Sequence, residues 1–394
     1  MMSAQVSQNA RPALLSFGFR PFFLLASLWS AASLTIWVVM LFTGSALPSR
    51  FDPLAWHIHE MLFGFVLGTI AGFLLTAVAN WTGREPVKGA LLALLVGFWL
   101  LGRAVCLFSA LTPFWFAAAC DLAFPVILAC VVAHEIVAAR NLRNLPIIGV
   151  IAVLGLADLL MHLEAAQAID AGGSGWRLGL AAIVILISVI AGRIVPAFTR
   201  NWLTQRNKKG VPAPPGPLDR GALGVLHAGL ALWALAPDFW LSGLLLILAA
   251  VLNGWRLWRW HGAATAAEPL LLILHIGYAW LVLGVALLGL AIIDPTVPLG
   301  AAIHALTVGA IGTMILAVMT RATRGHTGRP LAADRVTGAL YVLASLAAVS
   351  RIAAALMPDW YLPLLAVSGA FWAAAFLGFA AAYGPMLLGP RRGT

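Results

Sequence analysis

The stretch HEMLFGFVLGTIAGFLLTAVANWTG (residues 59–83) returns later in the chain as HALTVGAIGTMILAVMTRATRGHTG (residues 304–328). In each copy a histidine comes first, a glycine follows five residues later, and the sequence Thr-Gly-Arg closes the segment. The apolar part of each copy is about 20 residues long, enough for a helix that crosses ~30 Å of hydrocarbon. Two histidines at equivalent places on two repeated membrane helices should lie at the same depth, where a flat cofactor could bridge them.

The composition of the whole chain indicates the same class of protein. Hydrophobic residues make up 62% of the chain and charged residues 10%, with a mean hydropathy of +0.97, which excludes a water-soluble globular protein. We predict an all-α polytopic membrane protein with about twelve transmembrane helices in contact with the lipid bilayer. The predicted spans are residues 19–43, 57–79, 88–108, 113–138, 146–164, 177–200, 220–236, 238–258, 268–292, 299–321, 333–357 and 361–384.

The basic residues predict the orientation of these spans. They gather at the two chain ends and in every second loop, where we find Arg11, Arg20, Arg84, Lys88, Arg140, Arg143, Arg206, Lys208, Lys209, Arg256, Arg259, Arg324, Arg329, Arg335, Arg391 and Arg392. By the positive-inside rule both termini face the cytoplasm. The net charge of +10 follows from this distribution, so it does not indicate a nucleic-acid partner.

We therefore predict one membrane domain between two cytoplasmic tails. The tails are residues 1–18 and the basic residues 385–394, and the transmembrane domain is residues 19–384. A proline-rich cytoplasmic linker at residues 205–219 interrupts it near the middle of the chain.

The repeat extends beyond two helices. The sixth and tenth predicted spans both end in Thr-Arg (Thr199-Arg200, Thr320-Arg321), and the seventh and eleventh both follow Asp-Arg (Asp219-Arg220, Asp334-Arg335). Related helices thus recur every four spans, which predicts three pseudo-repeats of four helices.

Ionisable and metal-binding groups inside a membrane cost free energy, so each is a functional candidate. A haem between the second and tenth helices would take His59 on one face and His304 on the other, unless each histidine only hydrogen-bonds a neighbouring helix. His57 lies two residues before His59 and so on another face, where it is solvated or contacts a haem propionate or a second metal. Arg103 and Arg351, near the periplasmic ends of related helices, either pair with haem propionates or extend to the interface.

Three further histidines are candidate metal ligands. His275 and His227 would supply imidazoles to copper, a metal well served by histidine, or are unrelated core residues. His162 follows Asp158 by four residues on one helix face, so the pair forms a metal ligand with its carboxylate, a proton relay or a structural hydrogen bond. The cysteines lack Cys-x-x-Cys spacing and are predicted to be packing residues: Cys106, Cys120 and Cys130.

Several longer sequence motifs in this chain resemble those of a known protein family. They are FRPFF (19–23), WHIHEM (56–61), NLRNLP (141–146), GRIVPAFTRN (192–201), LHIGYAW (274–280), HALTVGAIGTM (304–314) and MTRATRGHTGRP (319–330). Through them the chain resembles the NnrS family. The resemblance implies a bacterial inner-membrane protein that contains haem, of the b type, and copper, and that acts in nitric oxide metabolism and resistance to nitrosative stress.

The three-by-four arrangement also resembles the catalytic subunit of the haem-copper oxidases, in which the second and tenth helices carry haem-ligating histidines. The sixth predicted span of this chain contains no histidine and the tenth lacks a histidine pair. A binuclear site of the oxidase type is therefore not expected.

Two classes of function remain at this point. The first is a haem and copper protein that binds or reduces nitric oxide, or another small uncharged molecule, with an unidentified electron donor if it is an oxidoreductase. The second is a transporter or permease whose buried histidines bind a substrate or relay protons. Transporter helices are usually broken near the midplane, and Pro125 and Pro196 are the main such disruptions here. The first class is therefore favoured.

Overall fold

A computed structural model describes residues 13–392, and within that range the chain is helical without a strand. Fourteen α-helices occur, and two pairs of them are continuous through a π-helical segment, which leaves twelve long helices. Eleven spans are long and apolar enough to cross a membrane. The predicted all-α polytopic membrane fold is thus confirmed. Residues 1–12 and 393–394 of the predicted tails lie outside the described residues.

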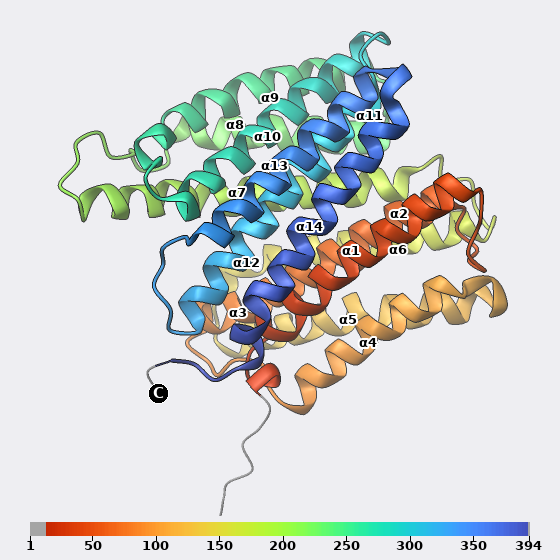
Figure 1. Ribbon diagram of the computed structural model, residues 1–394, viewed down its shortest axis with the longest axis horizontal. Coiled ribbons are helices and arrows are strands. Elements are labelled where there is room, and N and C mark those ends of the chain that lie inside the picture. The colour runs from red at the N-terminus through yellow and green to blue at the C-terminus, as the bar shows by residue number, and fades with distance from the viewer. Residues whose placement is uncertain (1–12, 393–394) are drawn as a thin grey trace, which may run out of the picture.

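The long helices run side by side as one bundle, with α8, α9 and α10 at one edge and α4 and α5 at the other (Figure 1). In chain order they are α1 (Phe19–Thr43), α2 (Pro53–His59) continued through η2 (Glu60–Val66) into α3 (Leu67–Thr82), α4 (Ala90–Leu107), α5 (Phe114–Ala138), α6 (Pro146–Ala165), α7 (Ser174–Thr204), α8 (Pro217–Leu235), α9 (Trp240–Trp258), α10 (Pro269–Ile293), α11 (Leu299–His304) continued through η6 (Ala305–Gly312) into α12 (Thr313–His326), α13 (Arg335–Leu356) and α14 (Tyr361–Leu388).

Short 3-10 segments precede or connect these helices. They are η1 (Ala13–Ser16), η3 (Ser109–Leu111), η4 (Leu142–Asn144), η5 (Gly262–Thr265) and η7 (Pro358–Trp360). The predicted linker corresponds to residues 205–216, between α7 and α8. Helix α14 continues to Leu388, so the first four residues of the predicted C-terminal tail belong to the last helix.

The centre of the bundle follows the predicted four-helix period. Three of the candidate spans are far more buried than the rest: Pro53–Thr82 at 83%, Ser174–Thr204 at 61% and Leu299–His326 at 72% of their apolar stretches. They correspond to the second, sixth and tenth predicted spans. In the other candidate spans the buried share lies between 33% and 39%. These three spans are the ones that the sequence groups as related. Each predicted unit of four helices therefore contributes one helix to the interior, and the two histidine-bearing repeats are the most buried of all.

The two repeats also share a backbone irregularity. Helix α2 ends at His59 and η2 follows directly, and α11 ends at His304 and η6 follows directly. π-Helical segments are rare and gather at functional sites, because the extra residue redirects the side chains around it. The sequence repeat is thus a repeat of local structure as well.

The second span begins four residues earlier than predicted. Its first residue is Pro53, and the Asp52 side chain caps the helix by accepting hydrogen bonds from the amides of Leu54 and Ala55, each at 2.9 Å. An aspartate cap followed by proline is a strong helix start. As a result His57 lies in the second turn of a helix and not at its start.

The two described ends of the chain lie together. Helix α1 packs along α14 (Figure 1). The buried Arg20 guanidinium donates hydrogen bonds to the carbonyl oxygens of Leu387 at 2.8 Å and Gly389 at 2.6 Å. These bonds satisfy carbonyls at the end of α14 that have no partner within the helix.

Candidate functional site

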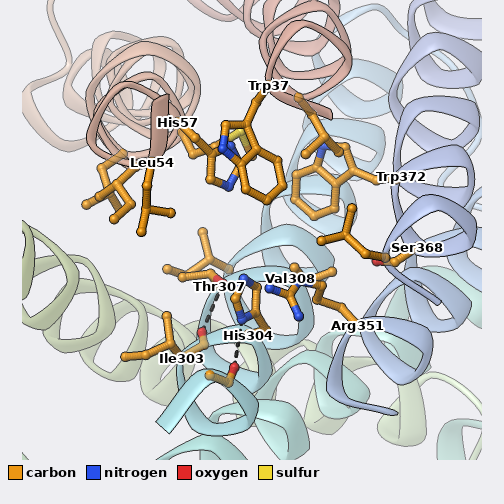
Figure 2. Close-up of a pocket in the computed structure, with 18 of the residues that line it drawn as sticks. Trp37, Leu54, His57, Ile303, His304, Thr307, Val308, Arg351, Ser368 and Trp372 are labelled. Carbon is orange, nitrogen blue, oxygen red and sulfur yellow. Dashed lines mark hydrogen bonds between the residues drawn. The ribbon is translucent and has the colours of Figure 1, made fainter. Parts of the chain in front are cut away.

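A cavity of about 310 Å³ lies between the two histidine-bearing repeats and the helices α1, α13 and α14. Most of its wall is apolar, and a few polar side chains converge on it, which is typical of sites for cofactors and small molecules. We call it the histidine cavity, after His57 and His304 in its lining. Figure 2 shows His57 with Trp37 on one side of the cavity and His304 with Arg351 on the other.

His304 is oriented by its own helix. Its Nδ1 atom donates a hydrogen bond to the carbonyl oxygen of Gly300 at 2.6 Å (Figure 2). Because a carbonyl only accepts, Nδ1 carries the proton and Nε2 keeps a free lone pair. A histidine whose Nδ1 proton is bound by a backbone carbonyl is the usual arrangement for an imidazole that ligates a metal through Nε2.

His57 is held by stacking. Its ring lies 4.2 Å from the Trp37 ring at an interplanar angle of 21°. Its Nδ1 atom is buried and has no hydrogen-bond partner within the described chain. A buried nitrogen without a partner costs free energy, so this ring is suited to a ligand that completes its coordination.

Arg351 brings a cation to the same cavity without a carboxylate partner among the described residues. Its Nη2 atom makes one long hydrogen bond of 3.4 Å to the Tyr361 hydroxyl, and its Nη1 atom is buried without a partner. A partly buried guanidinium that lacks an anion is unfavourable, and it pairs strongly with a carboxylate. The cavity therefore favours a ligand with an acidic group.

The second notable site lies on the other side of α2 and consists of seven polar side chains. None of them is more than 5% exposed. We call this group the polar cluster: His59, Glu60, Arg103, Cys106, Asp121, Asp158 and His162.

His59 is surrounded by carboxylates. Its Nδ1 atom lies 3.2 Å from Glu60 Oε1, and its Nε2 atom lies 2.8 Å from Asp158 Oδ1 and 3.1 Å from Asp121 Oδ2. The predicted pair on α6 forms as well, with His162 Nε2 3.7 Å from Asp158 Oδ1 and 3.2 Å from Asp121 Oδ2. Both histidines therefore meet at the same two aspartates.

Arg103 neutralises part of this charge. Its Nη1 atom donates to Glu60 Oε2 at 2.6 Å, and its Nη2 atom donates to Asp121 Oδ1. The Trp29 indole also donates to Glu60 Oε2, at 2.7 Å. Arg103 and Arg351 were predicted to play equivalent roles, but the structure places Arg103 in the polar cluster with two carboxylate partners and only Arg351 in the histidine cavity.

The polar cluster contains a set of four possible metal ligands. One donor atom each from His59, Cys106, Asp121 and His162 lies within 4.8 Å of the other three. The donors come from α2, α4, α5 and α6, so that four helices of the N-terminal half converge here.

The two histidines predicted as copper ligands lie at different heights along α7. His227 Nε2 hydrogen-bonds Ser188 Oγ at 3.0 Å, and His275 Nε2 hydrogen-bonds Thr199 Oγ1 at 2.9 Å. These hydroxyls are eleven residues apart on α7, which corresponds to roughly 16 Å of helix rise. The structure therefore does not bring the two imidazoles to one ion.

The structure also pairs the repeated histidines differently from the expectation. His59 and His304 were expected to face each other across one cofactor, whereas the structure places His57 in the cavity with His304 and turns His59 into the polar cluster. The prediction that His57 and His59 lie on different faces agrees with this arrangement. Which face meets His304 depends on how this helix is rotated against its neighbours in the bundle.

Three members of the polar cluster were missed from the sequence. Glu60 and Asp121 are carboxylates inside apolar spans, so the reasoning applied to the histidines would have found them. Cys106, predicted to be a packing residue, donates a hydrogen bond to Asp121 Oδ2 at 3.2 Å instead. No spacing rule could have found it, because its partners come from other helices.

Comparison with known proteins supports the resemblance seen in the sequence. The family model described as NnrS protein matches residues 13–391, nearly the whole chain. A search of curated proteins found no match.

Proposed function

The chain belongs to the NnrS family, and on this premise we propose that it is a haem- and copper-binding protein of the bacterial inner membrane. It acts in nitric oxide metabolism and in resistance to nitrosative stress. Both termini face the cytoplasm, a proposal supported by the concentration of arginine and lysine on that side. An electron donor is required if nitric oxide is reduced.

The histidine cavity would hold a haem, of the b type, between His57 and His304. The observation that carries this proposal is the free Nε2 lone pair of His304, fixed by the hydrogen bond from Nδ1 to Gly300 and directed at a cavity that also contains His57. His304 and His57 would hold the haem iron through their imidazoles. Arg351 would pair with a propionate, which supplies the anion that this guanidinium lacks.

When bound, a haem supplies an iron atom that binds nitric oxide and exchanges one electron. The protein contributes orientation and exclusion of water. His304 is fixed by its hydrogen bond, whereas His57 is held by stacking on Trp37 and has no hydrogen bond at Nδ1. His57 is therefore the imidazole that can move aside for a second ligand.

The route to the cavity needs no polar channel. Nitric oxide is small and uncharged, and it dissolves in the hydrocarbon of the bilayer. The lining between His57 and His304 is mainly apolar and includes Trp37 and Trp372. Such walls admit a neutral gas and disfavour ions, for which transfer out of water is costly.

The experiment that tests this proposal is the absorption spectrum of the full-length protein purified from haem-replete cells. Oxidised and dithionite-reduced samples are recorded with and without nitric oxide, together with iron and copper analysis. We expect a Soret band at about one haem per chain that shifts when nitric oxide is added. A colourless, metal-free protein would contradict the proposal and favour a transporter that uses its buried histidines for substrate or protons.

A further inference from the structure

We propose that the polar cluster binds one divalent transition-metal ion of the copper–zinc class through His59, Cys106, Asp121 and His162. The inference rests on the proposed function only for the expectation that the ion is copper. The ligand set itself follows from the geometry, charge and surroundings of the cluster.

The spacing of the donor atoms is the first argument. Asp121 Oδ2 lies 3.1 Å from His59 Nε2, 3.2 Å from His162 Nε2 and 3.2 Å from Cys106 Sγ. In a tetrahedral site with bonds of roughly 2.0 to 2.3 Å, neighbouring donors stand about 3.3 to 3.8 Å apart. Only small side-chain movements would therefore convert the hydrogen-bonded cluster into a coordination shell.

The charge of the cluster is the second argument. Glu60, Asp121 and Asp158 carry three carboxylates, and Arg103 is the one guanidinium that pairs with them in the described chain. With neutral histidines and a neutral thiol, two negative charges remain in a region where every side chain is buried. A net buried charge of this size is strongly unfavourable, and a bound divalent cation would reduce it to one negative charge once Cys106 has become the thiolate ligand.

The third argument is a buried carboxylate oxygen of Asp158 that has no hydrogen-bond partner in the described chain. Asp158 is 1% exposed, and its Oδ2 atom is buried without a hydrogen-bond partner in the described chain, although Oδ1 contacts His59 at 2.8 Å. Native proteins seldom leave a buried carboxylate oxygen unsatisfied. A cation held by the neighbouring Asp121 and the two histidines would offset the charge of this carboxylate without Asp158 being one of the four ligands.

The surroundings of the donors also suit a metal. Glu60 Oε1 lies 3.2 Å from His59 Nδ1. When His59 Nε2 binds an ion, Nδ1 donates a hydrogen bond to this carboxylate, and metal-binding histidines usually have such a partner. The Phe51 ring covers both imidazoles, 4.6 Å from the His59 ring and 5.1 Å from the His162 ring. The site is therefore supported by a hydrogen-bonded carboxylate and closed by an apolar lid.

The donor types select the metal. Two imidazoles and a thiolate favour copper or zinc, whereas magnesium and calcium prefer oxygen ligands throughout. In the ion-free cluster the Cys106 thiol donates a hydrogen bond to Asp121 Oδ2. When the ion binds, the thiol loses this proton to solvent and the thiolate becomes the ligand. No change in the oxidation state of the ion is required.

The test measures metal and haem separately in purified full-length protein, before and after incubation with Cu²⁺ or Zn²⁺ alone and removal of excess ion. Wild type should retain about one ion per chain. Cys106→Ser and His162→Gln should lower metal affinity by on the order of 10- to 100-fold or more, because each removes a ligand. Cys130→Ser is the matched control, since Cys130 is exposed and lies outside the cluster.

X-ray absorption at the metal edge provides a second readout that does not depend on stoichiometry. A sulfur neighbour at about 2.3 Å should be present in wild type and absent in Cys106→Ser. Full metal retention in both variants, or a wild type that binds haem but neither Cu²⁺ nor Zn²⁺, would overturn the metal site and leave the haem proposal standing. A protein that binds the ion but no haem would overturn the haem proposal alone.

Discussion

His57 and His59 are two residues apart on one helix, and their rings serve two separate sites. His57 stacks on Trp37 in the histidine cavity, and His59 lies 2.8 Å from Asp158 in the polar cluster. Because an α-helix turns by about 100° per residue, positions i and i+2 point in nearly opposite directions. Helix α2 therefore forms a shared wall between a proposed haem site and a proposed metal site.

Arg351 has no carboxylate partner in the described chain, so its removal should affect haem binding and protein stability in opposite directions. Arg351→Leu should weaken haem retention, because the propionate loses its cation. The haem-free form should keep its unfolding temperature or gain slightly, because a buried guanidinium without an anion is removed. Haem content and thermal unfolding in detergent measure the two effects.

Arg351→Lys is the control for this experiment, because it keeps the charge and should retain more haem than Arg351→Leu. Equal haem content in both variants would show that the charge at this position does not interact with the cofactor.

The ion pairs of Arg103 should be important for stability. Arg103→Met leaves Glu60 and Asp121 buried without their cation, a change that typically costs about 3 to 5 kcal/mol. Arg84→Met removes the more exposed pair with Glu135, and surface pairs are worth about 0 to 1 kcal/mol. Thermal unfolding of the two purified variants should differ clearly, and similar small losses would argue against a tightly paired cluster.

Gly312 packs against Trp372, which lines the histidine cavity. A side chain added at this glycine would displace the tryptophan without removing any polar group from the cavity. A Cβ atom on Gly312 would lie 2.5 Å from the Trp372 ring, whereas one on Gly338 would meet no atom within 4 Å. Gly312→Ala should therefore displace Trp372 and change the Soret maximum or the haem content, because Trp372 lines the cavity. Gly338→Ala should leave both unchanged, and identical spectra for the two variants would place the haem elsewhere.

Much of the fold could be predicted because it depends on hydropathy and on a repeat. Apolar runs long enough to cross a bilayer can be read directly from the sequence, and eleven spans in the described chain meet that criterion. His59 and His304 open two repeated sequence segments, and this repeat predicted that the two helices that contain them lie at the functional centre of the bundle. Their burial and the shared π-helical segments agree with that prediction.

The pairing of side chains could not be predicted in the same way. The choice between His57 and His59 depends on how α2 is rotated against the helices packed around it, since both residues belong to that helix. The polar cluster depends on packing between helices, since Cys106 and Asp121 belong to different spans and meet only in the folded bundle. Single-sequence spacing contains no information on such contacts.

We propose that His57 and His304, and not His59, hold the haem. To test this, the haem-to-protein ratio and the absorption spectrum are compared in His57→Ala, His304→Ala and His59→Ala, purified side by side. We expect that His304→Ala loses haem, that His57→Ala loses haem or changes its spectrum, and that His59→Ala keeps both. Loss of haem from His59→Ala together with a wild-type spectrum for His57→Ala would rule out this pair of ligands.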